Sequence, residues 1–140
     1  MHAGHFAENG YDKAFLNKFD TVFSGHFHKK SDDGHVYYLG NTYQMTWSDN
    51  GCPKGFHIFD TDTRSMEFVP NPYRMFHKIV YEDSDLTIND IANLDLENLS
   101  NGYVKIIVKN KTNPYLFDMF IDRVEQAGAA DIRVVEDHLD

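Results

Sequence analysis

The sequence is nearly free of cysteine and has no long apolar run. Cys52 is the only cysteine among 140 residues, so no disulfide can form within the chain, which is typical of a reducing cytoplasm. No stretch approaches the roughly 20 apolar residues that a membrane-spanning helix requires. The start, from Met1 to His5, lacks the basic and apolar regions of a secretion signal. These absences predict a cytoplasmic protein with no membrane partner.

Positive charge is also scarce. The formal net charge is −9. Residues 1–74 carry 7 Lys and Arg against 9 Asp and Glu, whereas residues 75–140 carry 6 against 13. This balance excludes a broadly basic nucleic-acid clamp, and the second half of the chain is strongly acidic. Any contact with nucleic acid must therefore be confined to a local patch of lysine and arginine.

Aromatic residues, in contrast, are plentiful. The chain has 11 Phe and 8 Tyr, enough to build a hydrophobic core. Short aromatic and β-branched runs, bounded by turn-forming residues, predict strands. After a short helix over 11–18, we expect strands at 19–24, 35–39, 42–47, 55–60, 64–69 and 76–81.

The end of the chain has a strand–helix–strand pattern. Residues 103–109 form the clearest strand of the sequence. Asn113 and Pro114 then open a helix as its cap and first residue, and Gly128 closes it. A last strand over 132–135 completes a βαβ unit.

An acidic linker at 82–85 precedes this pattern and marks a domain boundary. The linker is followed by a short helix within 86–99, with Thr87 as its cap. The fold class is therefore α/β (α+β), with domains over 1–81 and 82–140.

Two histidines follow the first strand at a spacing of two residues. Gly25 permits a turn after the strand, and His26 and His28 come next. Side chains at i and i+2 on an extended loop can reach one metal ion or two adjacent ions, and imidazole suits zinc, iron, nickel and copper, and manganese where carboxylates share the site. The same pattern is typical of two surface histidines on a turn, so the spacing alone leaves both interpretations open.

Four segments together resemble the calcineurin-like metallophosphoesterases. Residues 22–28 (Val-Phe-Ser-Gly-His-Phe-His) resemble the closing metal-binding motif of that superfamily, and residues 38–43 resemble the strand and turn that follow it. Residues 54–60 (Lys-Gly-Phe-His-Ile-Phe-Asp) resemble a strand of the DNA-repair branch, and the βαβ tail resembles its capping domain. Within that branch the chain most resembles the nuclease subunits of double-strand-break repair nuclease–ATPase complexes, in the form found in T-even-type bacteriophages.

The resemblance implies a fold and a chemistry. Residues 1–81 would be the C-terminal part of a metallophosphoesterase β-sandwich, the nuclease domain, and residues 82–140 a small βαβ-containing capping domain that contacts DNA. The activity would be hydrolysis of DNA at a site with two divalent metal ions, manganese or magnesium, and the partner an ATPase subunit acting in recombination and repair. By resemblance, His26 and His28 would each bind one of the two ions.

Most of the family's other metal-binding motifs have no counterpart here. The Asp-x-His, Gly-Asp and Gly-Asn-His motifs are missing. We therefore expect a C-terminal fragment that has no nuclease activity by itself. His5 or His2 is a candidate for a further ligand, because the family has one histidine upstream of the closing motif. By the same resemblance, residues 19–81 would supply mostly one sheet, with Phe23, Phe56 and Ile58 as candidates for its inner face. That face would lose its partner layer, which predicts a homodimer.

Several lysines are candidates for contacts with DNA phosphate, and for each the alternative is an ordinary surface charge. The candidates are Lys29, Lys30, Lys105 and Lys109. Lys54 and Arg74 are further candidates of this kind, with an ordinary surface charge as the favoured interpretation. Two other functions remain open. One is a metallophosphodiesterase that acts on small substrates, and the other is a non-catalytic module that docks DNA or the ATPase.

Overall fold

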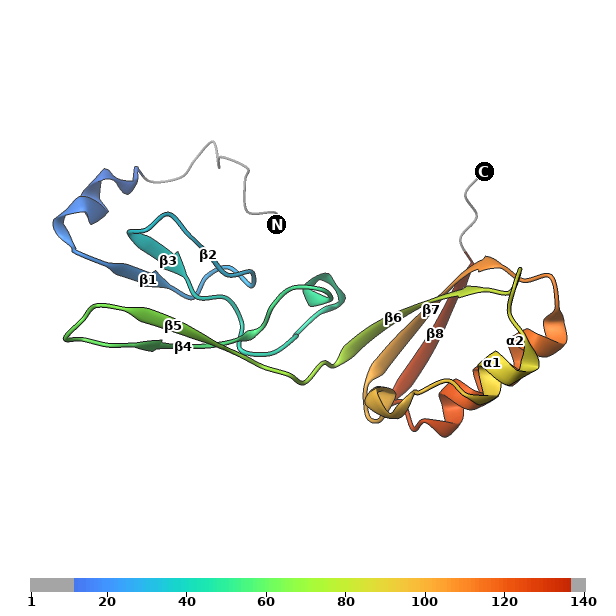
Figure 1. Ribbon diagram of the computed structural model, residues 1–140. Helices are drawn as coiled ribbons and strands as arrows, with labels where there is room; N and C mark the ends of the chain where they lie inside the picture. Colours follow the sequence, from blue (N-terminus) through green and yellow to red (C-terminus); the bar gives the residue numbers. More distant parts are fainter. Residues whose placement is uncertain (1–11, 137–140) are drawn as a thin grey trace. The chain divides into compact units, whose positions relative to one another are not determined.

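The computed structural model describes residues 12–136, and the chain divides into two compact units between Tyr73 and Arg74 (Figure 1). The sequence placed the division later, after Tyr81. The difference concerns strand β6 (Phe76–Glu82), which pairs with β7 (Tyr103–Asn110) of the second unit. An apolar run reveals a strand but not its partner, because the partner is chosen by tertiary packing.

The first unit begins with a 3-10 helix and a three-stranded sheet. Helix η1 (Lys13–Lys18) is capped by Asp12, whose carboxylate accepts the backbone N–H of Ala14 at 2.9 Å. The sheet has the order β1-β3-β2, with β1 (Val22–Ser24) parallel to β3 (Val36–Tyr38) and β2 (Ser31–Asp32) antiparallel to β3. The loop after β1 therefore emerges at the carboxyl end of a parallel strand pair.

A separate hairpin completes the strands of the first unit. β4 (Gly55–Phe59) pairs antiparallel with β5 (Met66–Pro70), as the sequence predicted. The turn between them is fixed by Asp60, which accepts two backbone N–H groups. The expectation of mostly one sheet over 19–81 is wrong, because the hairpin forms its own two-stranded sheet and β6 belongs to the second unit.

The strand expected over 42–47 does not form. A 3-10 turn, η2 (Trp47–Asp49), occupies the end of this segment. The carboxylate of Asp49 accepts the backbone N–H groups of Met45 and Thr46 at 2.9 and 3.1 Å. These two donors are thereby withdrawn from any strand ladder, which explains the loop.

The second unit is a parallel sheet with helices on one face. Its order is β6-β7-β8, and β7, helix α2 and β8 (Asp131–Glu136) form the predicted βαβ unit. Helix α2 (Pro114–Gln126) begins where predicted, with Asn113 accepting backbone N–H groups as its cap. Two short helices complete the unit: α1 (Ile88–Ala92), capped by Thr87, and η3 (Glu97–Leu99).

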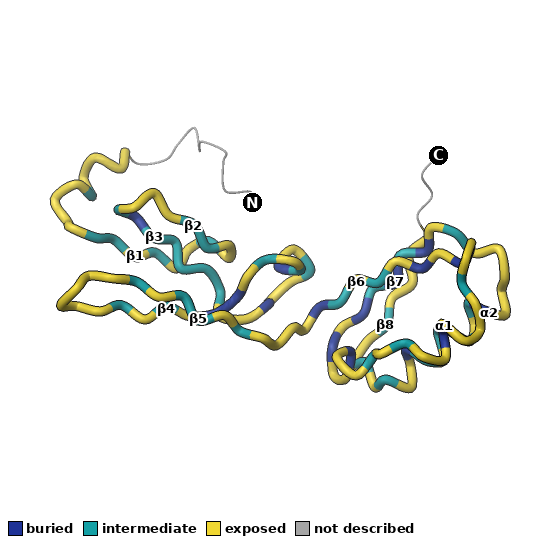
Figure 2. Tube along the Cα trace, in the orientation of Figure 1, coloured by how far each residue is buried: buried dark blue, intermediate teal, exposed yellow. Residues whose placement is uncertain are grey.

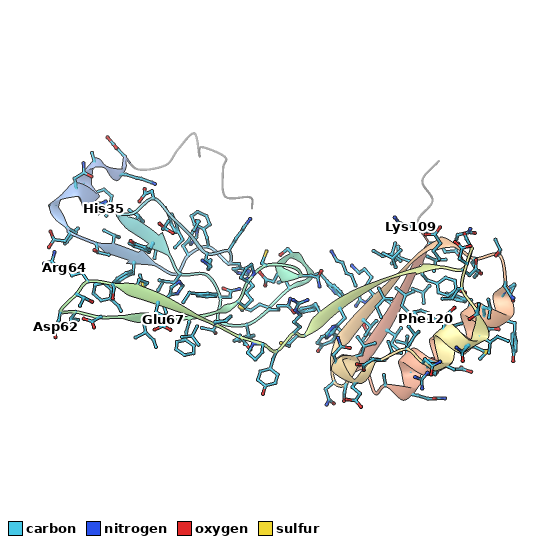
Figure 3. The ribbon with its side chains drawn as sticks, in the orientation of Figure 1. His35, Asp62, Arg64, Glu67, Lys109 and Phe120 are labelled. Atoms are coloured by element: carbon cyan, nitrogen blue, oxygen red, sulfur yellow. The ribbon has the colours of Figure 1, made fainter. Side chains whose placement is uncertain are left out.

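The hydrophobic core of the protein lies in the second unit. Phe120 points from α2 toward the sheet and is 4% exposed (Figure 3). The rest of this core comprises Tyr81, Ile91, Leu99, Val104, Ile106, Val108, Leu116 and Val124.

Among the described residues of the first unit, Val36 is the one buried hydrophobic side chain, and most of the chain around it is half-buried or exposed (Figure 2). Phe23, Phe56 and Ile58 are 43%, 53% and 51% exposed.

The structure is thus a mixed α/β protein with several small sheets and few helices. No helix within residues 12–136 has the length and apolar character needed to cross a membrane.

Candidate metal-binding loop

The loop after β1 presents both histidines of the Gly-His-x-His motif to solvent. His26 and His28 are exposed, whereas Phe27 between them is half-buried. Phe27 packs edge-on against Tyr38 of β3, with ring centroids 4.8 Å apart. Phe27 is thus anchored on the sheet, while both histidines beside it stay at the surface. The loop therefore offers two imidazoles at the carboxyl end of β1.

The backbone of this loop is held by residues from the next turn of the chain. The backbone N–H of Asn41 donates to the carbonyl of His28 at 3.1 Å. Gly40 has a φ of +76°, and a Cβ there would lie 2.9 Å from the backbone nitrogen of Lys30. Only glycine allows this approach. The Gly-Asn turn singled out in the sequence thus packs directly on the histidine loop.

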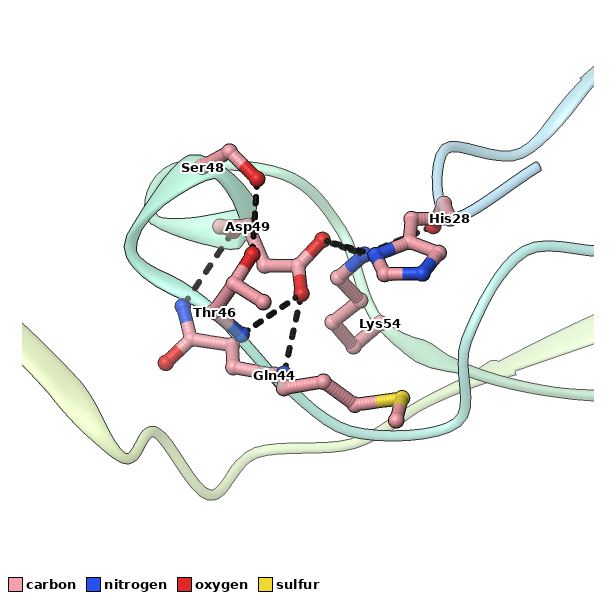
Figure 4. A network of polar contacts seen from close by, with 7 residues as sticks. His28, Gln44, Thr46, Ser48, Asp49 and Lys54 are labelled. Atoms are coloured by element: carbon pink, nitrogen blue, oxygen red, sulfur yellow. Dashed lines mark hydrogen bonds and ion pairs between the residues drawn. The ribbon is translucent and has the colours of Figure 1, made fainter. Parts of the chain in front are cut away.

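A buried ion pair lies beneath His28, and the sequence did not reveal it. Asp49 and Lys54 are 2% and 4% exposed, and Lys54 Nζ lies 2.8 Å from Asp49 Oδ1. Lys54 also donates to the backbone carbonyl of His28 at 2.6 Å, and Asp49 Oδ1 lies 3.5 Å from His28 Nδ1 (Figure 4). The interpretation of Lys54 as a surface charge is wrong. No signal in the sequence marked this pairing, because an isolated lysine does not show which carboxylate it will meet.

The surroundings of Asp49 keep it ionised. Burial would by itself raise the pKa of Asp49, but hydrogen bonds from Lys54 and from the backbone N–H groups of Met45 and Thr46 lower it to about 2. The carboxylate beside His28 is therefore negatively charged at neutral pH.

The side chains near this loop determine whether it can form a metal centre. Imidazole nitrogens suit manganese and zinc, so His26 and His28 are chemically suitable ligands. However, residues 12–136 contain no cluster of three or more His, Cys, Asp or Glu side chains able to hold an ion. The loop therefore fits one side of a metal centre and does not make a complete one. His2 and His5, the other candidate ligands, lie outside the described residues.

The candidate lysines of the first unit lie close to the histidine loop. Lys29 is exposed, and Lys30 places its Nζ 4.8 Å from the ring centroid of Phe68 on β5. A cation over an aromatic ring has a partner within the fold. Lys29 remains available at the surface beside His28, while Lys30 is partly committed to packing.

In the second unit, the register of the sheet aligns three basic residues, called here the basic row. Lys78 of β6 is opposite Lys105 of β7, which is opposite Arg133 of β8. By strand alternation this row lies on the face opposite to the buried residues Val104 and Ile106.

The face that carries the basic row has two further features. Lys109 falls on it near the end of β7 (Figure 3). In the row next to the basic row, the rings of Phe76 and Tyr103 stack with centroids 5.3 Å apart. Of the predicted candidates, Lys105 and Lys109 thus share one face, and the sequence missed Lys78 and Arg133 because register is not visible in it.

Comparison with known proteins places a nuclease-related protein among the relatives of this chain. That relative is Exonuclease subunit 1 of Enterobacteria phage T4, 33% identical over 100 residues, which are 71% of this chain and 27% of that protein. Toll-like receptor 1 of Homo sapiens is also similar, at 26% identity over 106 residues, 70% of this chain and 12% of the receptor. The chain spans a minor part of either relative. No family model matches it, and no solved structure matches it.

Proposed function

We propose that this chain is the C-terminal part of a metal-dependent DNA nuclease subunit of the metallophosphoesterase superfamily, in which His26 and His28 each bind one of two divalent ions, manganese or magnesium. The observation that carries the proposal is the similarity to a phage exonuclease subunit. It is supported by a loop that exposes both imidazoles at the carboxyl end of β1. The first unit would be part of the nuclease domain and the second unit the capping domain.

The role of this chain in the reaction is to present ligands and to fix their position. When bound, two divalent ions activate a water molecule and stabilise charge on the phosphodiester. His26 and His28 would contribute one imidazole each, and the packing of Phe27 on Tyr38 would hold the loop between them. Because residues 12–136 lack a cluster of three metal-binding side chains, the described chain alone should have no nuclease activity.

DNA and an ATPase subunit are the proposed partners. The basic row and Lys109 form the local positive patch that an acidic unit would need to approach DNA phosphate. The adjacent Tyr103, 39% exposed, offers a ring on which a base could stack. This face would also let the unit dock DNA without taking part in catalysis, which is the alternative function.

The proposal is tested in the full-length gene product by the substitutions His26→Ala and His28→Ala. Manganese-dependent hydrolysis of double-stranded DNA should fall in each variant by more than the roughly 10- to 100-fold typical of lost outer-shell partners of a metal ligand. His35→Ala is the control, since its ring is held by the carbonyl of Phe19 at 2.7 Å. Unchanged activity in both loop variants, or turnover by the 140-residue chain alone, would refute the proposal. Activity on a nucleotide diester but not on DNA would indicate a small-substrate enzyme.

A further inference from the structure

The burial of Asp49 and Lys54 needs an explanation, because the first unit buries so little else. Both side chains are 3% exposed, in a unit where Val36 is the one buried hydrophobic residue that the structure describes. A buried ion pair is costly to desolvate and is often no more stable than well-packed apolar residues of the same size. General stability therefore does not account for placing two charges here.

Both members of the buried pair also contact His28. Lys54 Nζ, besides its contact with Asp49, donates to the backbone carbonyl of His28 at 2.6 Å. Asp49 Oδ1, besides accepting from Lys54, lies 3.5 Å from Nδ1 of the His28 ring. Its other oxygen, Oδ2, accepts backbone N–H groups of its own loop, which fixes the direction of the carboxylate. Both the main chain and the ring of His28 are thus contacted by one buried pair.

We propose that Asp49 and Lys54 are positioning residues for His28, an inference that rests on the proposed function. Lys54 holds the main chain of His28, and Asp49 draws the proton of the ring to Nδ1. The lone pair is then left on Nε2, which points away from Asp49 and is free to bind a cation (Figure 4). Histidines that bind metals generally donate their other ring N–H to a carboxylate or carbonyl group, which sets their tautomer and orientation.

His26 provides an internal reference for this arrangement. Among the ion pairs within residues 12–136, none joins His26 to a carboxylate, and its recorded ring contact is with Phe27. The two histidines are on the same loop, and both are exposed to solvent. A difference between their tautomers would therefore report the effect of Asp49 rather than of the loop.

The test is a measurement of ring-nitrogen chemical shifts by NMR on the unmodified 140-residue chain, at a pH where the imidazoles are neutral. We expect His28 to be mainly protonated on Nδ1, while His26 shows the Nε2-protonated form that unrestrained histidine side chains favour. Equal tautomer populations at His26 and His28 would overturn the inference. This arm needs no substitution, so it does not depend on the folding of a variant.

A second arm uses Asp49→Asn, with Asp33→Asn as the matched control. Asp33 belongs to the same unit and also accepts backbone N–H groups, but its recorded partners do not include His26 or His28. The Asp49 variant should shift the tautomer of His28 toward that of His26. In the full-length protein it should raise the manganese concentration for half-maximal activity by about 10- to 100-fold. Asp33→Asn should change neither, and an unaltered His28 tautomer in Asp49→Asn would contradict the inference.

The results also separate this inference from the function it rests on. Equal tautomers with activity lost in His28→Ala would reject the positioning role and keep the nuclease proposal. If His28 is protonated on Nδ1 but His28→Ala retains full nuclease activity, the nuclease proposal is rejected. The positioning of His28 would then have no role in metal binding.

Discussion

The two units of this chain differ in what they bury. The second unit encloses a continuous apolar core in which Ile91, Val104, Ile106 and Val124 are fully buried. The first unit buries polar and charged side chains, namely Gln44, Asp49 and Lys54, and a single hydrophobic one, Val36, among its described residues. One unit is thus organised by apolar packing and the other by a polar network around a loop.

Composition does not explain this difference. Seven phenylalanines lie within residues 12–73, and none of them is buried, whereas two of the three in the second unit are. Each exposed apolar side chain forgoes about 25 cal/mol per Å² of surface that burial would contribute. The first unit therefore has the material for a core without the layer that would enclose it. This contrast is what the proposed nuclease domain predicts, because the rest of that domain would supply the missing layer.

The largest expected effect comes from core truncation in the second unit. Ile106→Ala removes a side chain that is 0% exposed and should lower the free energy of unfolding of that unit by about 2–5 kcal/mol. Ile58→Ala, at a residue 51% exposed in the first unit, should cost about 1 kcal/mol or less. Urea unfolding followed by Trp47 fluorescence for the first unit and by helical circular dichroism for the second measures both. Equal losses of unfolding free energy in the two variants would contradict the proposed difference between the units.

Acid should affect the second unit through Asp83. Its carboxylate accepts the backbone N–H groups of Thr112 and Asn113 before α2, and the hydrogen bond from Thr112 is the largest cause of its lowered pKa. A lowered pKa in the folded state gives stability that is present above the unfolded value of 3.8 and is lost as pH falls through the folded value. Asp83→Asn should therefore be less stable at neutral pH and show a weaker acid transition of α2, followed by circular dichroism. An unchanged transition would contradict this role.

The basic row should matter for DNA but not for folding. Replacing Lys78, Lys105 and Arg133 by glutamine should reduce the slope of log affinity against log salt concentration by about 2.7 if each residue contacts one phosphate. Lys111→Gln is the control, because Lys111 follows β7 and lies outside the basic row. Arg133, which is itself paired with Asp131 at 3.2 Å, should contribute least of the three. Fluorescence anisotropy with duplex DNA measures both slopes. An unchanged slope in the triple variant would exclude this face as the DNA contact.

The smallest effect on stability is expected from the exposed apolar residues of the first unit. Phe56→Ser with Ile58→Ser should change the free energy of unfolding little, because both residues are about half exposed. The same change should weaken the proposed homodimer, since the exposed sheet face is where a second copy would pack. Sedimentation at several concentrations compares the two proteins. A wild-type chain that is monomeric throughout would reject the dimer.

The sequence predicted the second unit more completely than the first, and the reason is physical. Local residues specify three elements of the second unit: the cap at Asn113, helix α2 and the strand at 103–109. All three form in the structure as predicted. The strand expected over 42–47 failed because Asp49, a few residues away, takes its backbone donors. In the first unit such polar contacts replace the apolar periodicity on which sequence-based prediction depends.

The two histidines of the candidate site could be selected from the sequence, whereas the residues that support them could not. His26 and His28 could be selected because a Gly-His-x-His loop after a strand is a recognisable pattern. The burial of Lys54 could not be predicted, because an isolated lysine in a sequence does not show which carboxylate it will contact. The basic row was hidden for a similar reason, since it exists only once three strands are in register.

The central claim is that the second unit is stabilised by its own core while the first depends on further contacts. Amide hydrogen exchange of the 140-residue chain, at a concentration low enough to keep it monomeric, tests this most directly. The account predicts that amides of β6 and β7 exchange only through global opening of the second unit, and that those of β1 and β4 exchange orders of magnitude faster. Equal protection of the strands in both units would contradict it.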